Sequence, residues 1–236
     1  MATQAKEVFT RVQLILQDKT AVRWSIRELR LWANDGLREI VSMKPSANPR
    51  TVILSLAAGT KQEIPNSAIA LIRVIRNMSN AATNAIGRAA IITVPREVMD
   101  SQSPDWHDPD VYPPEKRVTH AVYDPEDQRH FYVWPPNNGD GYVEALVSRY
   151  PNEIPSASPP EKLDSYTSVV DLQDIYINAL IDYVLYRAYL KDNDVSGNPE
   201  RAMAHYTAMA NSLGVKVKNE LGSNPNTTAA ATRIAT

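Results

Sequence analysis

The spacing of apolar residues changes twice along this chain, and each change marks a change of secondary structure. Near the N-terminus apolar residues recur every three or four positions, which is typical of one face of a helix. These positions are Val8, Val12, Ile15, Leu16, Ile26, Leu29, Ala33, Leu37 and Ile40. Ser25 and Glu28 have the spacing of a capping box that opens the second helix, and Pro45 closes it. The N-terminal segment is therefore predicted to form a helix hairpin.

The middle of the chain has the spacing and composition of β-strands. Residues 51–57 are apolar and β-branched, and a turn at Gly59 and Thr60 is expected to return them to a short partner strand at 62–64. Further strands are predicted at 71–78, 89–98, 118–123, 130–134 and 142–150. Because turn-forming residues separate the last three, we expect those three strands to form a meander.

The helical period returns in the C-terminal third. Ser168 and Asp171 are expected to cap a helix that runs to about Lys191 and is apolar on most of its circumference, so it should be the central core helix. Asn198 has the position of an N-cap for a last helix, which Gly214 is expected to end. Proline-rich segments at 100–114 and 152–160 are predicted to be ordered connections.

These elements predict an α+β fold with a discontinuous helical part. Residues 1–50 and 165–221 are expected to form a helical bundle, and residues 51–164 an inserted antiparallel β region with proline-rich loops. Residues 222–236 offer small side chains and no periodicity, so they cannot offset the cost of ordering a backbone on their own. We expect this segment to be an extended C-terminal arm.

Composition excludes several classes of protein. The chain has no cysteine, which removes disulfide scaffolds, thiolate metal sites and thiol nucleophiles. It has only 8 glycines, and no phosphate-binding glycine motif occurs. A nucleotide-dependent enzyme is therefore not expected, and no cofactor is. The sequence also contains no secretory signal and no apolar run long enough to span a membrane.

Charge is distributed unevenly along the chain. Residues 1–96 carry 14 basic and 6 acidic side chains, whereas residues 97–164 carry 5 basic and 14 acidic ones. Such polarity favours assembly through complementary faces, and the alternative is that the acidic segment is simply solvated. A pI of about 6.1 argues against a DNA-binding module, since such modules concentrate basic charge.

The densest group of chemically active side chains is Asp105, His107 and Asp108, with Asp110 close behind. Carboxylates and imidazoles bind metals and move protons, so a metal or catalytic site could be assembled here. No second histidine has ligand spacing, however, and aspartates among prolines are usually turn formers. We therefore expect neither a metal nor a catalytic site.

Two further groups have a functional and a structural interpretation. The helix predicted to end near Lys191 carries Tyr176, Tyr183, Tyr186 and Tyr189, which could stack nucleic-acid bases but more often pack at an interface. Arg23, Arg27, Arg30 and Arg38 could contact phosphates, and solvation or subunit salt bridges explain them equally well.

The order of several segments resembles that of a known family. The segments are RWSIRELRLWANDGLREIVSMKP (23–45), GTKQEIP (59–65), LIRVIRN (71–77), PREVMDSQSPDWH (95–107), VYDPEDQRHFYVWPP (122–136) and VSRYP (147–151). Together they resemble the head-to-tail adaptor proteins of tailed bacteriophages. The resemblance implies a structural virion protein of the neck, made in the host cytoplasm, with no catalysis.

The same resemblance implies partners. It implies a homo-oligomeric ring of about twelve copies that docks beneath the portal protein and receives tail or nozzle proteins. DNA would pass through the lumen without sequence-specific binding, and no membrane is involved. We expect Arg233 and Ile234 of the C-terminal arm to contact the portal. At least one of Trp24, Trp32, Trp106 and Trp134 is expected to anchor a subunit interface.

Two alternatives remain open at this point. The first is a virion-associated hydrolase that uses Asp105, His107 and Asp108. The second is a DNA-binding module.

Overall fold

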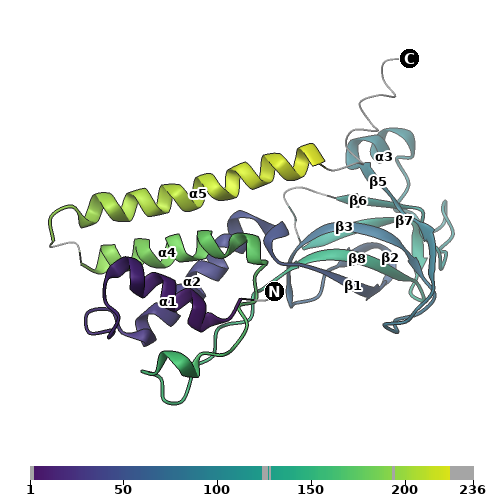
Figure 1. The fold of residues 1–236 in the computed structure, drawn as a ribbon. Coiled ribbons are helices and arrows are strands. Elements are labelled where there is room, and N and C mark those ends of the chain that lie inside the picture. Colours follow the sequence, from purple (N-terminus) through teal and green to yellow (C-terminus); the bar gives the residue numbers. More distant parts are fainter. Residues whose placement is uncertain (1–2, 124–126, 128, 193–194, 224–236) are drawn as a thin grey trace. The chain divides into compact units, whose positions relative to one another are not determined.

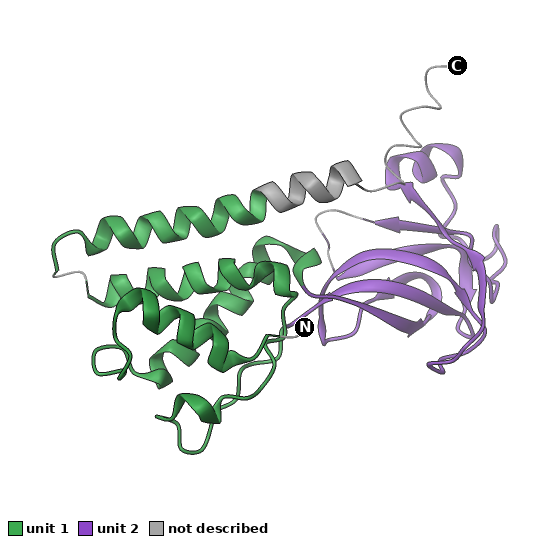
Figure 2. Ribbon diagram, viewed as in Figure 1, with its two compact units in different colours: residues 1–47, 151–236 green, residues 48–150 purple. Residues whose placement is uncertain are grey.

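The computed structural model describes residues 3–123, 127, 129–192 and 195–223. The fold is α+β, as predicted. It divides into two compact units, which Figure 2 colours separately: unit 1 comprises residues 1–47 and 151–236, and unit 2 comprises residues 48–150. The expected β region reached residue 164, but residues 151–164 belong with the helices. Ile154 explains this difference, because its buried backbone donates to and accepts from the side chain of Asn34 on a unit 1 helix.

Unit 1 is built around one buried helix. Its helices are α1 (Ala5–Leu16), α2 (Ile26–Met43), α4 (Ile177–Lys191) and α5 (Asn198–Ser223), with short 3-10 turns η1 (Pro45–Ala47), η2 (Leu163–Ser165) and η3 (Asp174–Tyr176). Helix α4 contacts α1, α2 and α5, and α5 runs beside it in Figure 1. As predicted, α4 is buried on most of its circumference. The tyrosines of this segment pack within unit 1, where Tyr183 meets Tyr186 and Tyr186 meets Tyr206.

The connection between α1 and α2 is fixed by hydrogen bonds. The predicted capping box is present, with Ser25 and Glu28 each binding the other's backbone. Just before it, the Asp18 carboxylate accepts hydrogen bonds from the backbone N–H groups of Val22, Arg23 and Trp24. Burial acts to raise the pKa of Asp18, but these three donors outweigh burial and hold it below its usual value. The two helices are therefore joined by a well-ordered turn.

Two helix boundaries differ from the prediction. Helix α4 begins at Ile177 and not near Ser168, because the backbone around Ser168 forms a strand-like bridge to the N-terminal segment, where Ala5 N–H donates to Ser168 C=O. Helix α5 continues through Gly214 to Ser223. A single glycine in a helix costs only about 1 kcal/mol, so Gly214 does not end it.

Unit 2 consists of two sheets around one core. Its elements are β1 (Pro49–Ser55), β2 (Ala58–Glu63), β3 (Ala68–Met78), β4 (Gly87–Ala90), β5 (Ile92–Pro95), α3 (Arg96–Gln102), β6 (His120–Tyr123), β7 (His130–Asn138) and β8 (Tyr142–Arg149). The strand orders are β1-β8-β3-β4 and β2-β7-β6-β5. Inward-facing residues of both sheets, such as Leu54, Val74, Phe131 and Val143, form a single apolar cluster. The two sheets therefore pack face to face.

Most strands were predicted, but their partners were not. The single strand expected at 89–98 is instead β4 and β5, which lie in different sheets, followed by the start of α3. Strands β1 and β2 do not pair as a hairpin, because β1 pairs with β8 and β2 pairs with β7. Strands β6 and β7 are antiparallel neighbours as expected, but β8 lies in the other sheet, so the three strands do not form a meander. The β region is also not wholly antiparallel, since β5 and β6 are parallel. Turn residues mark where a strand ends but not which strand it will pair with.

Gly36 on α2 allows the close approach of α4. A Cβ atom at position 36 would lie 2.7 Å from Tyr183 Cδ1 and 2.9 Å from Leu180 Cδ1. Gly214 on α5 has no neighbour within 4 Å of the same position. We predict that Gly36→Ala lowers the free energy of unfolding by about 1–3 kcal/mol through overpacking. Gly214→Ala should leave it unchanged or raise it by about 0.5–1 kcal/mol. Chemical denaturation of both variants tests this, and equal effects would contradict the packing.

Candidate functional site

The segment 100–114 covers the outer face of one sheet. Trp106 is fully buried there with Met99 and Val122, against Tyr132 and Trp134. The Trp106 indole N–H donates to Asp100 Oδ1 at 2.8 Å. This segment was expected to contain no helix, but its first residues, 100–102, end α3. The anchored tryptophan explains why the rest of the proline-rich segment has a fixed position.

His107 is held by the same packing. Its ring lies on that of Trp106 with centroids 3.6 Å apart, and its Nδ1 is hydrogen bonded to Thr60 Oγ1 at 2.7 Å. Burial lowers the pKa of His107, the nearby Arg96 lowers it further, and Asp100 opposes both. Together these effects favour the neutral form of the imidazole.

The aspartates beside His107 are exposed and shape the loop. Asp108 Oδ1 accepts a hydrogen bond from Asp110 N–H, and Asp108 N–H donates to Asp105 C=O. Within the part of the chain that the structure describes, no group of three or more His, Asp or Glu side chains could hold a metal ion. We call residues 105–110 the acidic loop. Its three carboxylates, from Asp105, Asp108 and Asp110, form no ion pair with any described residue.

The four tryptophans differ in burial. Trp24 and Trp106 are buried within their own units, and the Trp24 indole donates to Ala188 C=O at 3.0 Å. Trp32 and Trp134 are only partly buried. The ring of Trp134 contacts Tyr112 and His120, and its indole N–H has no hydrogen-bond partner among the described residues. Trp24 and Trp106 thus have structural roles within the chain.

Unit 2 carries a concave basic surface that the sequence analysis did not identify. A hollow of about 330 Å³ is lined by Asn77, Met78, Arg88, Lys116, Arg117 and Tyr142. Its three cations are exposed, and none has a carboxylate partner in the described ranges. We call it the basic hollow. Only the adjacent pair Lys116 and Arg117 could have been noticed in the sequence, because Arg88 comes from a distant strand.

Two buried asparagines position the cations of the basic hollow. Asn77 Oδ1 accepts from Val118 N–H at 3.0 Å, and its Nδ2 donates to Val118 C=O at 2.8 Å and to Ala89 C=O at 3.0 Å. The residues beside Arg88 and Arg117 are thereby clamped together. Asn137 Nδ2 donates in the same way to the carbonyl groups of Glu115 and Lys116. The charges are thus placed by the buried network of unit 2.

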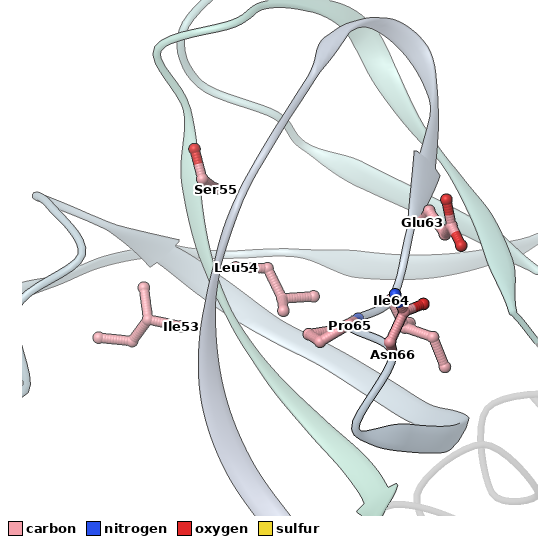
Figure 3. A pocket seen from close by; sticks show the side chains of 7 residues that line it. All are labelled: Ile53, Leu54, Ser55, Glu63, Ile64, Pro65 and Asn66. Carbon is pink, nitrogen blue, oxygen red and sulfur yellow. The ribbon is translucent and has the colours of Figure 1, made fainter.

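A second hollow lies at the free edges of the two sheets. It measures about 400 Å³ and is lined by Ile53, Leu54, Ser55, Glu63, Ile64, Pro65 and Asn66 (Figure 3). Strands β1 and β2 are edge strands of their sheets, and edge strands are common sites of strand addition. Arg233 and Ile234 of the expected arm lie outside the described residues.

The remaining arginines singled out in the sequence lie in unit 1. Arg23 pairs with Asp192 and Arg38 with Glu153, while Arg30 donates to the Ile154 carbonyl. Arg27 is exposed. Most of this group is therefore occupied by contacts within unit 1.

Comparison with protein families decides the identity of the chain. The model of the SU10 adaptor protein family matches residues 3–232. The chain belongs to the SU10 adaptor family. A comparison with individual curated proteins found no match.

Membership of the SU10 adaptor family confirms the resemblance to phage adaptors. The family is a structural component of the bacteriophage virion and is not known for enzymes. An SU10 adaptor interacts with other virion proteins. Among the described residues, no helix has the length and hydrophobicity that crossing a membrane requires.

The Asn77 clamp can be tested by its effect on stability. Asn77→Ala would leave the buried N–H and C=O of Val118 without their partner, so we predict a loss of about 1–3 kcal/mol in the free energy of unfolding. Asn80→Ala is the control, because Asn80 is exposed and its Oδ1 accepts only a local bond from Ala82 N–H. Thermal denaturation of both variants tests the clamp, and an Asn77→Ala variant as stable as the control would refute it.

Proposed function

We propose that this SU10 adaptor forms a ring that joins the portal vertex of the phage head to the tail. The match of the family over residues 3–232 carries this proposal. The ring would contain about twelve copies, with DNA passing through its lumen without sequence-specific binding. It would lie in the neck of the virion, after synthesis in the host cytoplasm.

The two-unit organisation is compatible with two separate docking surfaces. Each unit has its own buried core, so each can present a face without depending on the other for stability. We propose that the helices packed around α4 act as a bundle that forms the body of the ring. Unit 2 would present a second surface for portal, tail or nozzle proteins.

We propose that the residues beyond α5, 224–236, form an arm that docks on the portal, with Ile234 as an apolar anchor and Arg233 as a charge contact. Gly222 and Ser223, which were expected in this arm, are the last residues of α5. The composition of residues 224–236 supports this role, because small side chains can follow an extended path on another protein. Main-chain hydrogen bonds, as in strand addition, would then offset the cost of ordering about 1–2 kcal/mol per residue.

The arm is tested by truncation after Ser223. We predict that a chain lacking residues 224–236 keeps its melting temperature and forms rings, but no longer docks on portal-bearing heads. Native mass measurement with and without portal gives ring size and docking together. The matched control is a full-length double variant, Arg233→Ala with Ile234→Ala. It removes the two proposed anchor side chains but keeps the length of the arm. Normal docking of the truncated chain would refute the arm, and absence of any ring with wild-type protein, alone or with portal, would refute the adaptor proposal.

Trp32 is one of the two partly buried tryptophans, with Trp134, that remain candidates for a subunit interface. It lies on α2 and is only partly buried, whereas Trp24 and Trp106 fill the cores. We predict that Trp32→Ala weakens assembly about tenfold or more, as loss of an interface anchor does, with little change in melting temperature. Trp106→Ala is the comparison, because removing a buried tryptophan costs about 3–5 kcal/mol of stability. Assembly that falls only when melting temperature falls would show that Trp32 is not an anchor.

A further inference from the structure

Unit 2 carries two charged surfaces of opposite sign, neither of which has an ion-pair partner among the described residues. The basic hollow presents Arg88, Lys116 and Arg117, and the acidic loop presents Asp105, Asp108 and Asp110. The charged groups on each surface are exposed and form no ion pair with any described residue. Three other arginines of unit 2 differ in this respect: Arg76 binds Glu144, Arg96 binds Asp100 and Arg129 binds Glu63.

The two surfaces do not pair with each other among the described residues of one copy. The acidic loop is anchored by Trp106, which contacts Tyr132 on β7. The basic hollow begins beside Glu115, which bridges to Asn137 on the same strand. The two anchors are therefore separate points on β7, and no carboxylate of the acidic loop pairs with a cation of the basic hollow among the described residues.

Both surfaces are held in place before any partner arrives. The acidic loop is fixed by the buried Trp106 and its bond to Asp100. The backbone of the basic hollow is fixed by Asn77 and Asn137. Preorganised charges lose less entropy on pairing than mobile ones. The shapes of the two surfaces are also complementary, because one is a loop and the other is a hollow of about 330 Å³.

We propose that the basic hollow of one copy receives the acidic loop of the next copy. This inference rests on the proposed ring and assigns one of its subunit contacts. Because the two surfaces lie at different places on unit 2, the contact is heterologous, and repeated heterologous contacts close into a ring when the rotation between copies allows.

DNA phosphate is the competing occupant of the basic hollow. Three cations on a concave surface also suit a phosphate backbone. The chain as a whole has a net charge of −2 and a pI of about 6.1, and the acidic loop lies on the same unit as the hollow. The acidic loop would repel DNA, whereas the acidic loop of a second copy is complementary in charge to the hollow, so the second copy is favoured.

The experiment is a charge swap in the full-length chain, followed by native mass measurement at increasing salt. One variant reverses the hollow (Arg88→Glu, Lys116→Glu, Arg117→Glu), and another reverses the loop (Asp105→Lys, Asp108→Lys, Asp110→Lys). A third variant carries all six substitutions. The control is Arg11→Glu, Lys19→Glu and Arg27→Glu, which makes the same charge change at exposed positions of unit 1.

We expect each single-surface variant to raise the concentration needed for half-assembly about tenfold or more, since like charges then face each other. The six-substitution variant should restore assembly, and the unit 1 control should assemble as wild type does. Thermal melting establishes that each variant is folded. Wild-type assembly should weaken as salt rises, because exposed pairs are screened.

Several outcomes would overturn the inference. Normal ring formation by both single-surface variants would remove this contact while leaving the proposed ring intact. Failure of the six-substitution variant to recover would show that the surfaces do not face each other. Normal assembly of the hollow variant, with loss of its binding to a labelled DNA duplex, would assign the hollow to DNA. If wild-type protein forms no ring alone or with portal, the proposed function fails before this contact is tested.

Discussion

The structure depends on the hydrogen bonds that join the two ends of the unit 2 segment, at Asn48 and Arg149. Arg149 N–H donates to Asn48 C=O at 3.2 Å, and the Asn48 side chain donates back to Arg149 C=O at 3.3 Å. From there β1 and β8 pair in register, beginning with Pro49 opposite Ser148. Because the insertion leaves and returns at neighbouring points, the helical segments before and after it can share one core around α4. The pairing of β1 with β8 closes the inserted segment within its own sheet. The entropic cost of closing this long loop is therefore met within unit 2 and not by the helices of unit 1.

Local signals in the sequence were enough to place most elements. The capping box of Ser25 and Glu28, the apolar circumference of α4 and the strands β3, β6, β7 and β8 were all predicted from spacing and turn residues. Sheet partners were not predictable, because the pairing of β1 with β8 is a long-range choice that no local residue specifies. The start of α4 was wrong for a related reason, since the backbone at Ser168 bonds to Ala5. Likewise the basic hollow combines Arg88 with the distant pair Lys116 and Arg117, which only the fold brings together.

The distribution of satisfied and unsatisfied groups separates structural residues from candidate functional ones. The buried side chains of Asn34, Asn77 and Asn137 form hydrogen bonds with backbone groups, and those of Trp24 and Trp106 pack in the cores. Such residues hold the molecule together and leave little for a partner. The exposed charges of the basic hollow and the acidic loop have no partner among the described residues, so they are available for assembly. In a structural member of the SU10 adaptor family, exposed charged surfaces of this kind are the candidate functional sites.

The most direct test of this account is a cryo-electron microscopy structure of the virion neck at a resolution that shows side chains. The account predicts a closed ring of this protein between portal and tail. In that ring, the cations Arg88, Lys116 and Arg117 of each copy should lie within about 4 Å of the carboxylates of Asp105, Asp108 and Asp110 of the next. A neck without such a ring would contradict the adaptor role. A ring whose basic hollows face solvent, the portal or DNA would contradict the assigned contact between copies.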